Sequence, residues 1–504
     1  MENNNNNNQQ PVLSVQEQTK IRMEKIDKLK EKGVQPFGFR FDVKDKICDI
    51  KEKYLQYEKE QLEEMNVKAT VAGRIITKRD MGKIAFCNLQ DRDGNIQIYI
   101  RKDVIGEDAY SIFKLSDIGD LIGITGDVMK TNTGELTIKV SEYTHLVKAL
   151  RPLPEKFHGL VDVEERYRRR YVDLIVNEQS RKTAINRTRI IREMQNYFDS
   201  LGFIEVETPC LTGMVTGAAA RPFVTHHNAL DRDYYLRIAT ELNLKRLLVG
   251  GLERVYEIGR IFRNEGMDTK HSPEFTTVEL YQAFGDLRSM MELTETCFKR
   301  IAKNVFNGQE TFVWEDKEID LSKPFEVISM VDLVKKVTGI DFNEIKSFEE
   351  AKKLAEDRKL FVPSHFSGVG HILNLFFEEY CEDTLVQPTF LIRHPLEISP
   401  LTKKCEDDPR YVDRFELYIA GCEFANAYSE LNDPIDQKNR FVEQLKEKSM
   451  GNEEAGDIDN DFLEALEYGM PPAGGIGMGI DRIVMFFTGN SSIRDVILFP
   501  LMKD

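Results

Sequence analysis

The chain has 504 residues, 41% of them hydrophobic and 31% charged, with a formal net charge of −16. This length allows two or three domains with at least one large core. No apolar run is long enough to cross a membrane and no apolar signal segment opens the chain, which argues against a membrane-spanning or secreted protein. The negative charge offers nucleic acid no general attraction, although a local basic groove would still act within a Debye length of roughly 8–10 Å.

The cysteines indicate an intracellular protein. They are odd in number, scattered, and form no CxxC pair, which favours reduced thiols over disulfides or a zinc site. We expect a cytoplasmic location, and an organelle stays open as the alternative. For Cys422, beside Glu423, a redox role is conceivable, but a buried thiol is the simpler interpretation. The seven are Cys48, Cys87, Cys210, Cys297, Cys381, Cys405 and Cys422.

The first part of the chain is expected to carry no catalytic domain. Residues 1–15, which begin MENNNNNNQQ, predict a disordered tail. Residues 16–65 predict a helical extension. Its first helix covers residues 16–32 and stops at Gly33, and its basic face suits either a nucleic-acid backbone or water. Its second helix covers residues 47–65.

After the extension the apolar period changes to two, which indicates strands. Five short strands with a helix at residues 107–115 after the third are typical of an OB-type β-barrel, expected at residues 66–148. Such barrels stack single-stranded bases on aromatic side chains inside a basic rim. Phe86 and Gln97 lie on adjacent strands near Arg79 and are candidates for that role, although Phe86 taken alone fits the barrel core better. The strands are expected at residues 67–77, 83–89, 95–100, 121–128 and 135–143.

The rest of the chain predicts one large α+β domain. Residues 149–165 contain the proline-stiffened linker LRPLPEKFHG, and residues 166–504 mix strands and helices without repeats. A long helix is expected at residues 180–201. A helical insertion is expected at residues 340–400.

Residues 254–284, RVYEIGRIFRNEGMDTKHSPEFTTVELYQAF, predict two strands joined by a polar turn. One face of this hairpin mixes charges of both signs with aromatic rings. Buried charges are costly unless they are paired, so this face indicates a ligand that is itself charged and planar. A salt-bridged structural hairpin is the simpler alternative. The residues on the face are Arg263, Glu265, Phe275, Glu279 and Tyr281.

The loop of this hairpin adds a second signal. Arg263, Lys270 and His271 gather within it, and all three suit a polyphosphate. The glycines of residues 475–479 are weak evidence on their own, because no Gly-Lys-Ser/Thr follows them and they open no βαβ unit. A P-loop and a dinucleotide fold are therefore both disfavoured.

Three ordered motifs resemble those of the class II aminoacyl-tRNA synthetases. The helix that leads into GFIEVETP at residues 202–209 is similar to motif 1, FRNE at residues 262–265 to motif 2, and GIGMGIDR at residues 475–482 to motif 3. The OB domain and the stretches RPFVTHHNALDRDYYLRIATELNLKRLLVGG, FANAYSELNDPIDQ and SIRDVILFP extend the resemblance to the lysine-specific members of subclass IIb. The match covers nearly everything beyond the first 20 or so residues.

The resemblance implies an activity and a fold. It implies ATP-dependent activation of L-lysine and transfer of the lysyl group to the 3′ end of tRNA-Lys, with ATP as substrate and Mg²⁺ as cofactor. It also implies an antiparallel catalytic sheet of six to seven strands, an anticodon-binding OB fold, and a homodimer formed through motif 1.

The same resemblance assigns the candidate site residues, with Arg263 as the catalytic cation at the α-phosphate and the amino-acid carboxylate. ATP is expected at Arg263, Glu265, Lys270, His271, Phe275, Glu416, Glu423 and Arg482. Lysine is expected at Gly217, Glu241, Arg263, Glu279, Tyr281, Asn426, Tyr428 and Glu430. Mg²⁺ is expected at Glu416 and Glu423, and the anticodon at Arg79, Phe86, Gln97 and Glu135.

The metal assignment needs a local irregularity. A separation of seven residues puts Glu416 and Glu423 on opposite faces of one regular strand, so we expect a bulge near Gly421. The alternative is a structural role for Glu416 as the partner of Arg414. Three residues also depart from the usual pattern of the family: Thr216 and Ala218 stand where Pro and Gly are usual, and Thr240 stands where Pro is usual.

Substrate choice is expected to rest on charge. Lysine carries two ammonium groups, so its pocket needs acids, whereas an aspartate- or asparagine-specific relative needs a different far end; Glu279 and Glu430 favour lysine. A non-catalytic nucleic-acid-binding or scaffold protein is the alternative of another class. A transferase that modifies a protein with lysine is disfavoured, because such relatives lack the barrel.

Overall fold

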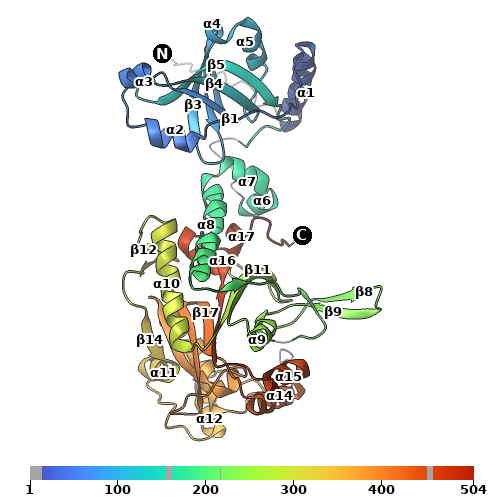
Figure 1. Ribbon diagram of the computed structural model, residues 1–504, viewed down its shortest axis with the longest axis vertical. Helices are drawn as coiled ribbons and strands as arrows, with labels where there is room; N and C mark the ends of the chain where they lie inside the picture. Colours follow the sequence, from blue (N-terminus) through green and yellow to red (C-terminus); the bar gives the residue numbers. More distant parts are fainter. Residues whose placement is uncertain are drawn as a thin grey trace, which may run out of the picture. The chain divides into compact units, whose positions relative to one another are not determined.

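The computed structural model describes residues 14–154, 160, 162–215, 217–218, 220–450 and 458–503. The Asn-rich start of the expected tail and residues 155–159 and 161 of the expected linker lie outside the described residues. The chain divides into two compact units, one running to Asp162 and the other starting at Val163, with Ile175–Asn177 grouped with the first (Figure 1).

The first unit is a closed barrel of five strands in the order β1-β2-β3-β5-β4. It confirms the OB-type barrel. Two short helices, α4 (Lys102–Ile105) and α5 (Glu107–Lys114), lie between the third and fourth strands. The strands are β1 (Lys68–Asp80), β2 (Ile84–Gln90), β3 (Asn95–Arg101), β4 (Leu121–Lys130) and β5 (Leu136–Val147).

Alternation along the strands decides which side chains fill the barrel. Cys87 on β2 and Ile96, Ile98 and Ile100 on β3 are at most 2% exposed, whereas their neighbours along each strand are half-buried on the outer face. Successive side chains of a strand point to opposite faces, so the period of two in the sequence is enough to identify the core. Phe86 belongs to the outer face, and its alternative placement in the core is wrong.

The helical extension differs from expectation in its second part. The single helix expected at residues 47–65 is broken into two. Ile50 and Leu62 both reach the barrel core, and on one straight helix side chains twelve positions apart would point about 120° away from each other. The helices are α1 (Val15–Glu31), α2 (Ile47–Tyr54) and α3 (Lys59–Met65).

The second unit is built on a sheet of eight strands in the order β14-β15-β16-β17-β18-β11-β10-β6. The six central strands are antiparallel, and the edge strands β14 and β6 each pair in parallel with a neighbour. The α+β class is confirmed: the six antiparallel strands match the expected sheet, and the structure adds one short parallel strand at each edge. The edge strands contain only four and two residues, too few to reveal themselves by alternation. The bounds are β14 (Glu326–Ser329), β15 (Thr389–Pro395), β16 (Tyr411–Ile419), β17 (Cys422–Ser429), β18 (Ala473–Gly479), β11 (Glu274–Ala283), β10 (Arg254–Phe262) and β6 (Ile204–Glu205).

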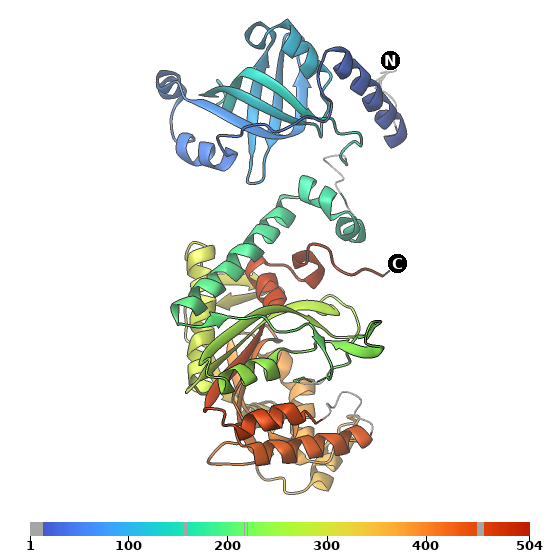
Figure 2. The same cartoon turned by 45° about the vertical axis from the view of Figure 1, so that its right-hand side comes forward.

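Helices cover one face of this sheet and leave the other for the site. α8 (Glu178–Ser200), α10 (Leu287–Val305) and α16 (Ile480–Thr488) enclose the largest core with the inward side chains of β11, β18, β17 and β16 (Figures 1 and 2). Within the described residues, no helix is both long and apolar enough to cross a membrane.

The helical insertion is shorter than expected at its C-terminal end. Residues 340–400 include α12 and α13, but they also include β15, an internal strand of the central sheet. The apolar run of that strand resembles a buried helix segment when its length is not considered. The remaining elements of this unit are α6 (Val163–Arg168), α7 (Arg170–Val176), β7 (Leu211–Thr212), β8 (Val224–His227), β9 (Arg232–Leu236), α9 (Glu241–Val249), β12 (Thr311–Trp314), β13 (Lys317–Asp320), α11 (Met330–Thr338), α12 (Phe348–Asp357), α13 (Val369–Tyr380), η1 (Glu382–Thr384), η2 (Leu396–Ile398), α14 (Pro434–Ser449), α15 (Asn460–Glu467) and α17 (Ile493–Val496).

A glycine at the barrel wall gives a test of this packing. A Cβ at Gly73 would lie 2.4 Å from the carbonyl oxygen of Gln90 on the paired strand, whereas a Cβ at Gly94 would make only an ordinary contact. Gly73→Ala should lower the free energy of unfolding of the barrel by about 1–3 kcal/mol, the usual cost of overpacking. Calorimetric unfolding of the purified protein measures it, with Gly94→Ala as the matched control. Equal stability of the two variants would contradict the packing described.

Candidate active site

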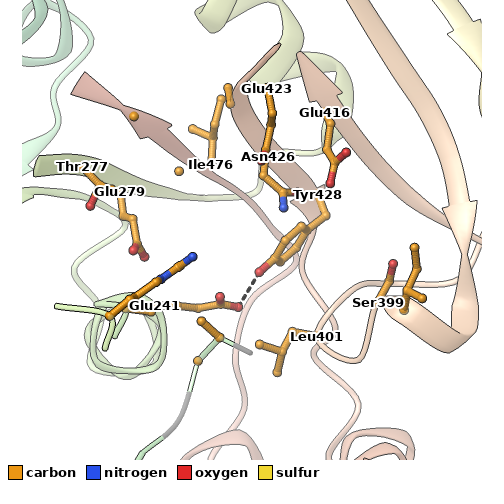
Figure 3. Close-up of a pocket in the computed structure, with 18 of the residues that line it drawn as sticks. Glu241, Thr277, Glu279, Ser399, Leu401, Glu416, Glu423, Asn426, Tyr428 and Ile476 are labelled. Atoms are coloured by element: carbon orange, nitrogen blue, oxygen red, sulfur yellow. Dashed lines mark hydrogen bonds between the residues drawn. The ribbon is translucent and has the colours of Figure 1, made fainter. Parts of the chain in front are cut away.

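A cavity of about 770 Å³ opens on the uncovered face of the central sheet (Figure 3). Its floor consists of outward side chains of β11, β18, β17 and β16, and helix α9 and the loop around Ser399 form part of its wall. Fourteen of the fifteen ATP-, lysine- and metal-binding candidates line this cavity. They are Gly217, Glu241, Arg263, Glu265, Lys270, His271, Phe275, Glu279, Tyr281, Glu416, Glu423, Asn426, Tyr428 and Arg482.

The register of the hairpin explains why its candidates converge. β10 and β11 pair so that Ile261 lies opposite Phe275 and Gly259 lies opposite Thr277. Alternate residues of β11 therefore face the cavity, from Phe275 to Tyr281, and the residues between them enter the core. The hairpin face predicted from the sequence is present.

One end of the cavity is cationic. The guanidinium carbon of Arg263 lies 5.4 Å from the centre of the Phe275 ring. Its Nε atom is buried, and no hydrogen-bond partner for it exists in the described part of the chain. The Nζ of Lys270 lies 3.2 Å from Sγ of Cys422, and Arg482 donates to the carbonyl of Glu423. Cys422 is buried, as expected. A guanidinium nitrogen left without an acceptor indicates a site for an anion.

The loop between the strands is held by an acidic residue. Asp268 accepts hydrogen bonds from the backbone N–H groups of Lys270 and His271, at 2.6 and 2.7 Å, and its other oxygen is 2.8 Å from Nδ1 of His271. This turn brings Lys270 and His271 to the cavity rim while their side chains stay partly exposed.

The two metal candidates lie on neighbouring strands, which corrects the expected geometry. Glu416 is on β16 and Glu423 on β17, joined by the turn at Ala420 and Gly421, both with positive φ. The bulge exists, but the extra residue is Phe424, between the pairs Leu417–Ala425 and Tyr418–Glu423. The fold back of the chain, together with this bulge, brings both carboxylates to the same end of the cavity (Figure 3).

The two carboxylates differ in their surroundings. Arg414 donates to Glu416 at 2.5 Å and Tyr418 donates to it at 2.8 Å. Burial opposes the charge of Glu416, but Arg414, His394 and the Tyr418 hydroxyl together outweigh it and lower the pKa of Glu416 below its usual range. Burial, and then the neighbouring charge of Glu416, raise the pKa of Glu423 to about 7. A cation between the two would favour the ionised form of both.

The residues present fit a hard divalent cation. Among the described residues, no three His, Cys, Asp or Glu side chains are grouped closely enough to hold a metal by themselves. Two carboxylates beside a cationic pocket match Mg²⁺, which usually binds one or two carboxylates and completes its shell with phosphate oxygens and water. The structural interpretation of Glu416, as the partner of Arg414, is also present in the geometry.

The opposite end of the cavity is acidic. The hydroxyl of Tyr428 donates to Oε1 of Glu241 at 2.6 Å (Figure 3), and the hydroxyl of Tyr281 donates to Oε2 of Glu279 at 3.2 Å. The backbone N–H of Thr240 approaches Oε1 of Glu279 at 3.3 Å, a contact that a proline at this position would lack. Burial and then the charge of Glu241 raise the pKa of Glu279.

Glu430 differs from the expectation. It does not line the cavity but lies over Gly475 beside Tyr281, on the same face of the sheet, where it binds Nζ of Lys245 and is 1% exposed. A Cβ at Gly475 would lie 2.0 Å from Oε1 of Glu430 and 2.5 Å from the Tyr281 ring. Burial raises the pKa of Glu430 to about 8 although Lys245 opposes this shift. The alternation of β17 still holds at Glu430, which pairs with Thr402 and donates its N–H to the carbonyl of Ala473, but Lys245 binds its carboxylate and keeps it out of the cavity lining.

Several residues at the site escaped sequence reasoning. Asp481, the first acid of α16, accepts from Arg187 of α8 at 2.5 Å and from the backbone N–H of Thr276 at 2.6 Å. This contact ties motif 1 to motif 3 and the hairpin. Lys245 follows Glu241 by four positions, a spacing that pairs side chains on a helix. This spacing was the one signal in the sequence that could have predicted the Lys245–Glu241 ion pair.

The loop that contains Gly217 is only partly described. Gly217 lines the cavity with φ +87°, and a Cβ there would lie 3.3 Å from the Cβ of Ala239. Thr216 and Ala219 lie outside the described residues.

The outer face of the barrel carries the anticodon candidates. The rings of Phe86 and Tyr99 stack with centroids 4.7 Å apart and planes 19° apart. Gln97 lies two positions from Tyr99 along β3 and accepts from Thr137 at 2.9 Å, while Arg79 pairs with Phe86 across the strands. Glu135 is exposed at the start of β5. Tyr99 was missed, although its alternation with Gln97 identifies the same face.

Nearby basic residues are less available than the sequence suggested. The Nζ of Lys78 donates to the carbonyls of Phe113 and Ser116 at 3.0 and 2.7 Å, and Arg74 donates to the carbonyl of Gly119 at 2.7 Å. Arg79 remains exposed beside the aromatic pair.

Comparison with known proteins agrees with this architecture. Residues 162–503 match the family model of class II tRNA synthetases (D, K and N), and residues 69–146 match that of the OB-fold nucleic acid binding domain. The chain is 56% identical to a lysine--tRNA ligase of Streptococcus sanguinis (strain SK36) over 96% of its own length and 97% of that protein. It is 55% identical to the lysine--tRNA ligase of Lactococcus lactis subsp. lactis (strain IL1403), over 97% and 98% of the two chains. The chain belongs to the class II tRNA synthetases of the D, K and N group and, within them, to the lysine--tRNA ligases.

Proposed function

We propose that this protein activates L-lysine with ATP and transfers the lysyl group to the 3′ end of tRNA-Lys. One observation carries the proposal: a single cavity has carboxylates at one end, Glu241 and Glu279, and cations at the other, Arg263, Lys270 and Arg482. A diamino acid and a polyphosphate fit these ends in one orientation only.

The chemistry needs positioning more than a protein nucleophile. The lysine carboxylate attacks the α-phosphorus of ATP, the bond to the bridging oxygen breaks, and pyrophosphate leaves. Arg263, with its unpaired buried nitrogen, would bind both the α-phosphate and the attacking carboxylate and so stabilise charge as it develops. Its guanidinium over Phe275 supports a position beside a planar base.

The remaining nucleotide contacts follow from the positions around Arg263. Lys270 and His271 at the rim would meet the outer phosphates. Phe275 and Arg482 would enclose the adenine ring, since a guanidinium can stack as well as donate, and Glu265 would accept from the adenine amino group. Glu416 and Glu423 would hold Mg²⁺, which when bound neutralises phosphate charge.

Lysine would lie with its ammonium groups toward the acidic end. We assign the α-ammonium to Glu241 and the backbone near Gly217, and the side-chain ammonium to Glu279 and Tyr281, with Asn426 and Tyr428 completing the wall. The carboxylate of Glu430, beside the Tyr281 ring, is paired with Lys245. An uncharged isostere would leave buried carboxylates unpaired, which is the physical basis of selection.

The barrel would bind the anticodon. The stacked Phe86 and Tyr99 rings offer a base-stacking surface with Arg79 at its edge, and Gln97 and Glu135 supply polar contacts. A homodimer formed through motif 1 remains part of the proposal, supported by the exposed apolar side chains of Ile204 and Leu211 on the two short strands that follow motif 1.

The direct test of the proposal is isotope exchange between ATP and pyrophosphate by the purified protein. Exchange should require lysine and Mg²⁺ and proceed without tRNA, because the adenylate forms before transfer. Exchange supported equally by aspartate or asparagine would contradict the assigned substrate.

The assignment of Arg263 predicts a large effect on the rate. Arg263→Ala should reduce lysine-dependent exchange by about 2–4 kcal/mol of transition-state stabilisation, or roughly 30- to 1000-fold, because one charged donor to the reacting phosphate is lost. Arg260→Ala is the matched control, since Arg260 lies three positions earlier on β10 and pairs with Glu274 at the surface. A reduction of less than threefold in Arg263→Ala would remove this residue from the reaction.

The assignment of the barrel predicts a separation of the two steps. Phe86→Ala should leave exchange unchanged and lower kcat/KM for tRNA charging by roughly tenfold, within the range for loss of one stacked base. Phe39→Ala, which removes an aromatic side chain that is 86% exposed in the same unit, is the control. Unchanged charging in Phe86→Ala would argue against base stacking at this surface.

A further inference from the structure

A lysine of the protein lies beside the proposed lysine site. Lys245 of α9 is 0% exposed, its Nζ is 2.6 Å from Oε1 of Glu241, and it also binds Oε2 of Glu430. The same nitrogen lies 5.3 Å from the centre of the Tyr428 ring and 6.0 Å from that of Tyr281. Carboxylates and aromatic faces around an ammonium group are the environment that a lysine substrate would require.

Burial of this ammonium is possible because it is doubly paired. An isolated buried charge costs more than most interactions can offset, and removal of one partner from a buried pair leaves the other uncompensated. Burial disfavours the charged form, but Glu241 and Glu430 outweigh it and raise the pKa of Lys245. Lys245 therefore remains a fixed positive charge within the wall of the pocket.

The number of charged groups around the amino-acid pocket indicates what Lys245 does. Glu241, Glu279 and Glu430 together carry three negative charges when ionised, and Lys245 cancels one of them. Two negative charges remain, equal in number to the ammonium groups of a diamino acid.

We propose that Lys245 is a specificity-determining residue, an internal counter-ion that sets the charge of the amino-acid pocket to match a substrate with two ammonium groups. The inference rests on the proposed function. Lys245 also fixes Glu241, since it and Tyr428 both bind the same carboxylate oxygen and leave the other oxygen for a ligand. A pocket with three uncancelled carboxylates would repel itself and take up a proton, and so lose the ionised acceptor that an ammonium group needs.

The test compares two variants in lysine-dependent exchange. Lys245→Met removes the charge at nearly constant shape and should raise KM for lysine by about tenfold or more, with KM for ATP changed less than twofold, because only binding at the acidic end is affected. The double variant Lys245→Met/Glu430→Gln removes one charge of each sign. The pocket of the double variant again has two uncancelled negative charges, and the variant should recover most of the lost affinity for lysine.

The control variant is Lys182→Met. Lys182 also pairs with a glutamate four positions away on a helix, Glu178 at 2.7 Å, but at the surface. It should leave both KM values unchanged. A merely structural ion pair would behave differently from a counter-ion, because its loss would disturb the whole site and change KM for ATP as much as KM for lysine.

Each outcome decides the inference. Unchanged KM for lysine in Lys245→Met, equal changes for lysine and ATP, or a double variant as impaired as the single one would overturn it while leaving the proposed function intact. Exchange by the unaltered protein that does not respond to lysine would overturn the proposed function and this inference together. Should Lys245→Met fail to fold, the double variant decides alone: a folded protein with KM for lysine within about threefold of the original supports charge matching, and any other result opposes it.

Discussion

Ionised carboxylates inside the protein are the constraint on which the catalytic unit depends. A carboxylate paired with a cation of the chain can be structural: Glu257 is bound by Arg237 and Asp481 by Arg187, and these pairs join separate segments of the fold. Glu241 and Glu416 also have a cation partner, but they line the cavity as well. Where the described chain supplies hydroxyl and amide donors but no cation, as at Glu279, the carboxylate is left for a ligand. The same desolvation penalty thus separates residues that hold the fold from residues that bind.

The antiparallel sheet places the buried carboxylates where they form a binding site. Because neighbouring strands pair in a fixed register, residues from β11, β17 and β16 reach one face at spacings set by the backbone, and the helices on the opposite face hold that register. A site on strands is more exact than one on loops, since each side chain inherits the rigidity of a ladder. The bulge at Phe424 turns Glu423 toward the cavity.

Much of the fold and of the site followed from the sequence for identifiable reasons. The barrel strands and the motif 2 hairpin alternate along most of their length, and alternation survives folding because it is a property of the extended backbone. The resemblance of the three motifs identified the cavity residues that strand alternation alone could not assign. The OB barrel and the membership of the class II D, K and N group are confirmed by the family matches.

The failures have one cause in common, which is tertiary contact. Glu430 lies on the predicted face with Asn426 and Tyr428, but a lysine from another element binds its carboxylate and removes it from the cavity lining. The helix expected at residues 47–65 is broken because its two halves pack on the barrel in different directions. The short parallel edge strands owe their existence to their neighbours, not to their own residues.

Gly475 carries a consequence for natural variation in this chain. The carboxylate of Glu430 and the ring of Tyr281 lie directly over this position, and any amino acid with a Cβ would collide with both. We therefore expect no substitution to be tolerated at this position, although the residue takes no part in the reaction. A screen of functional variants would find glycine at position 475 every time. A search for important residues that considers only reactive side chains would not identify this glycine.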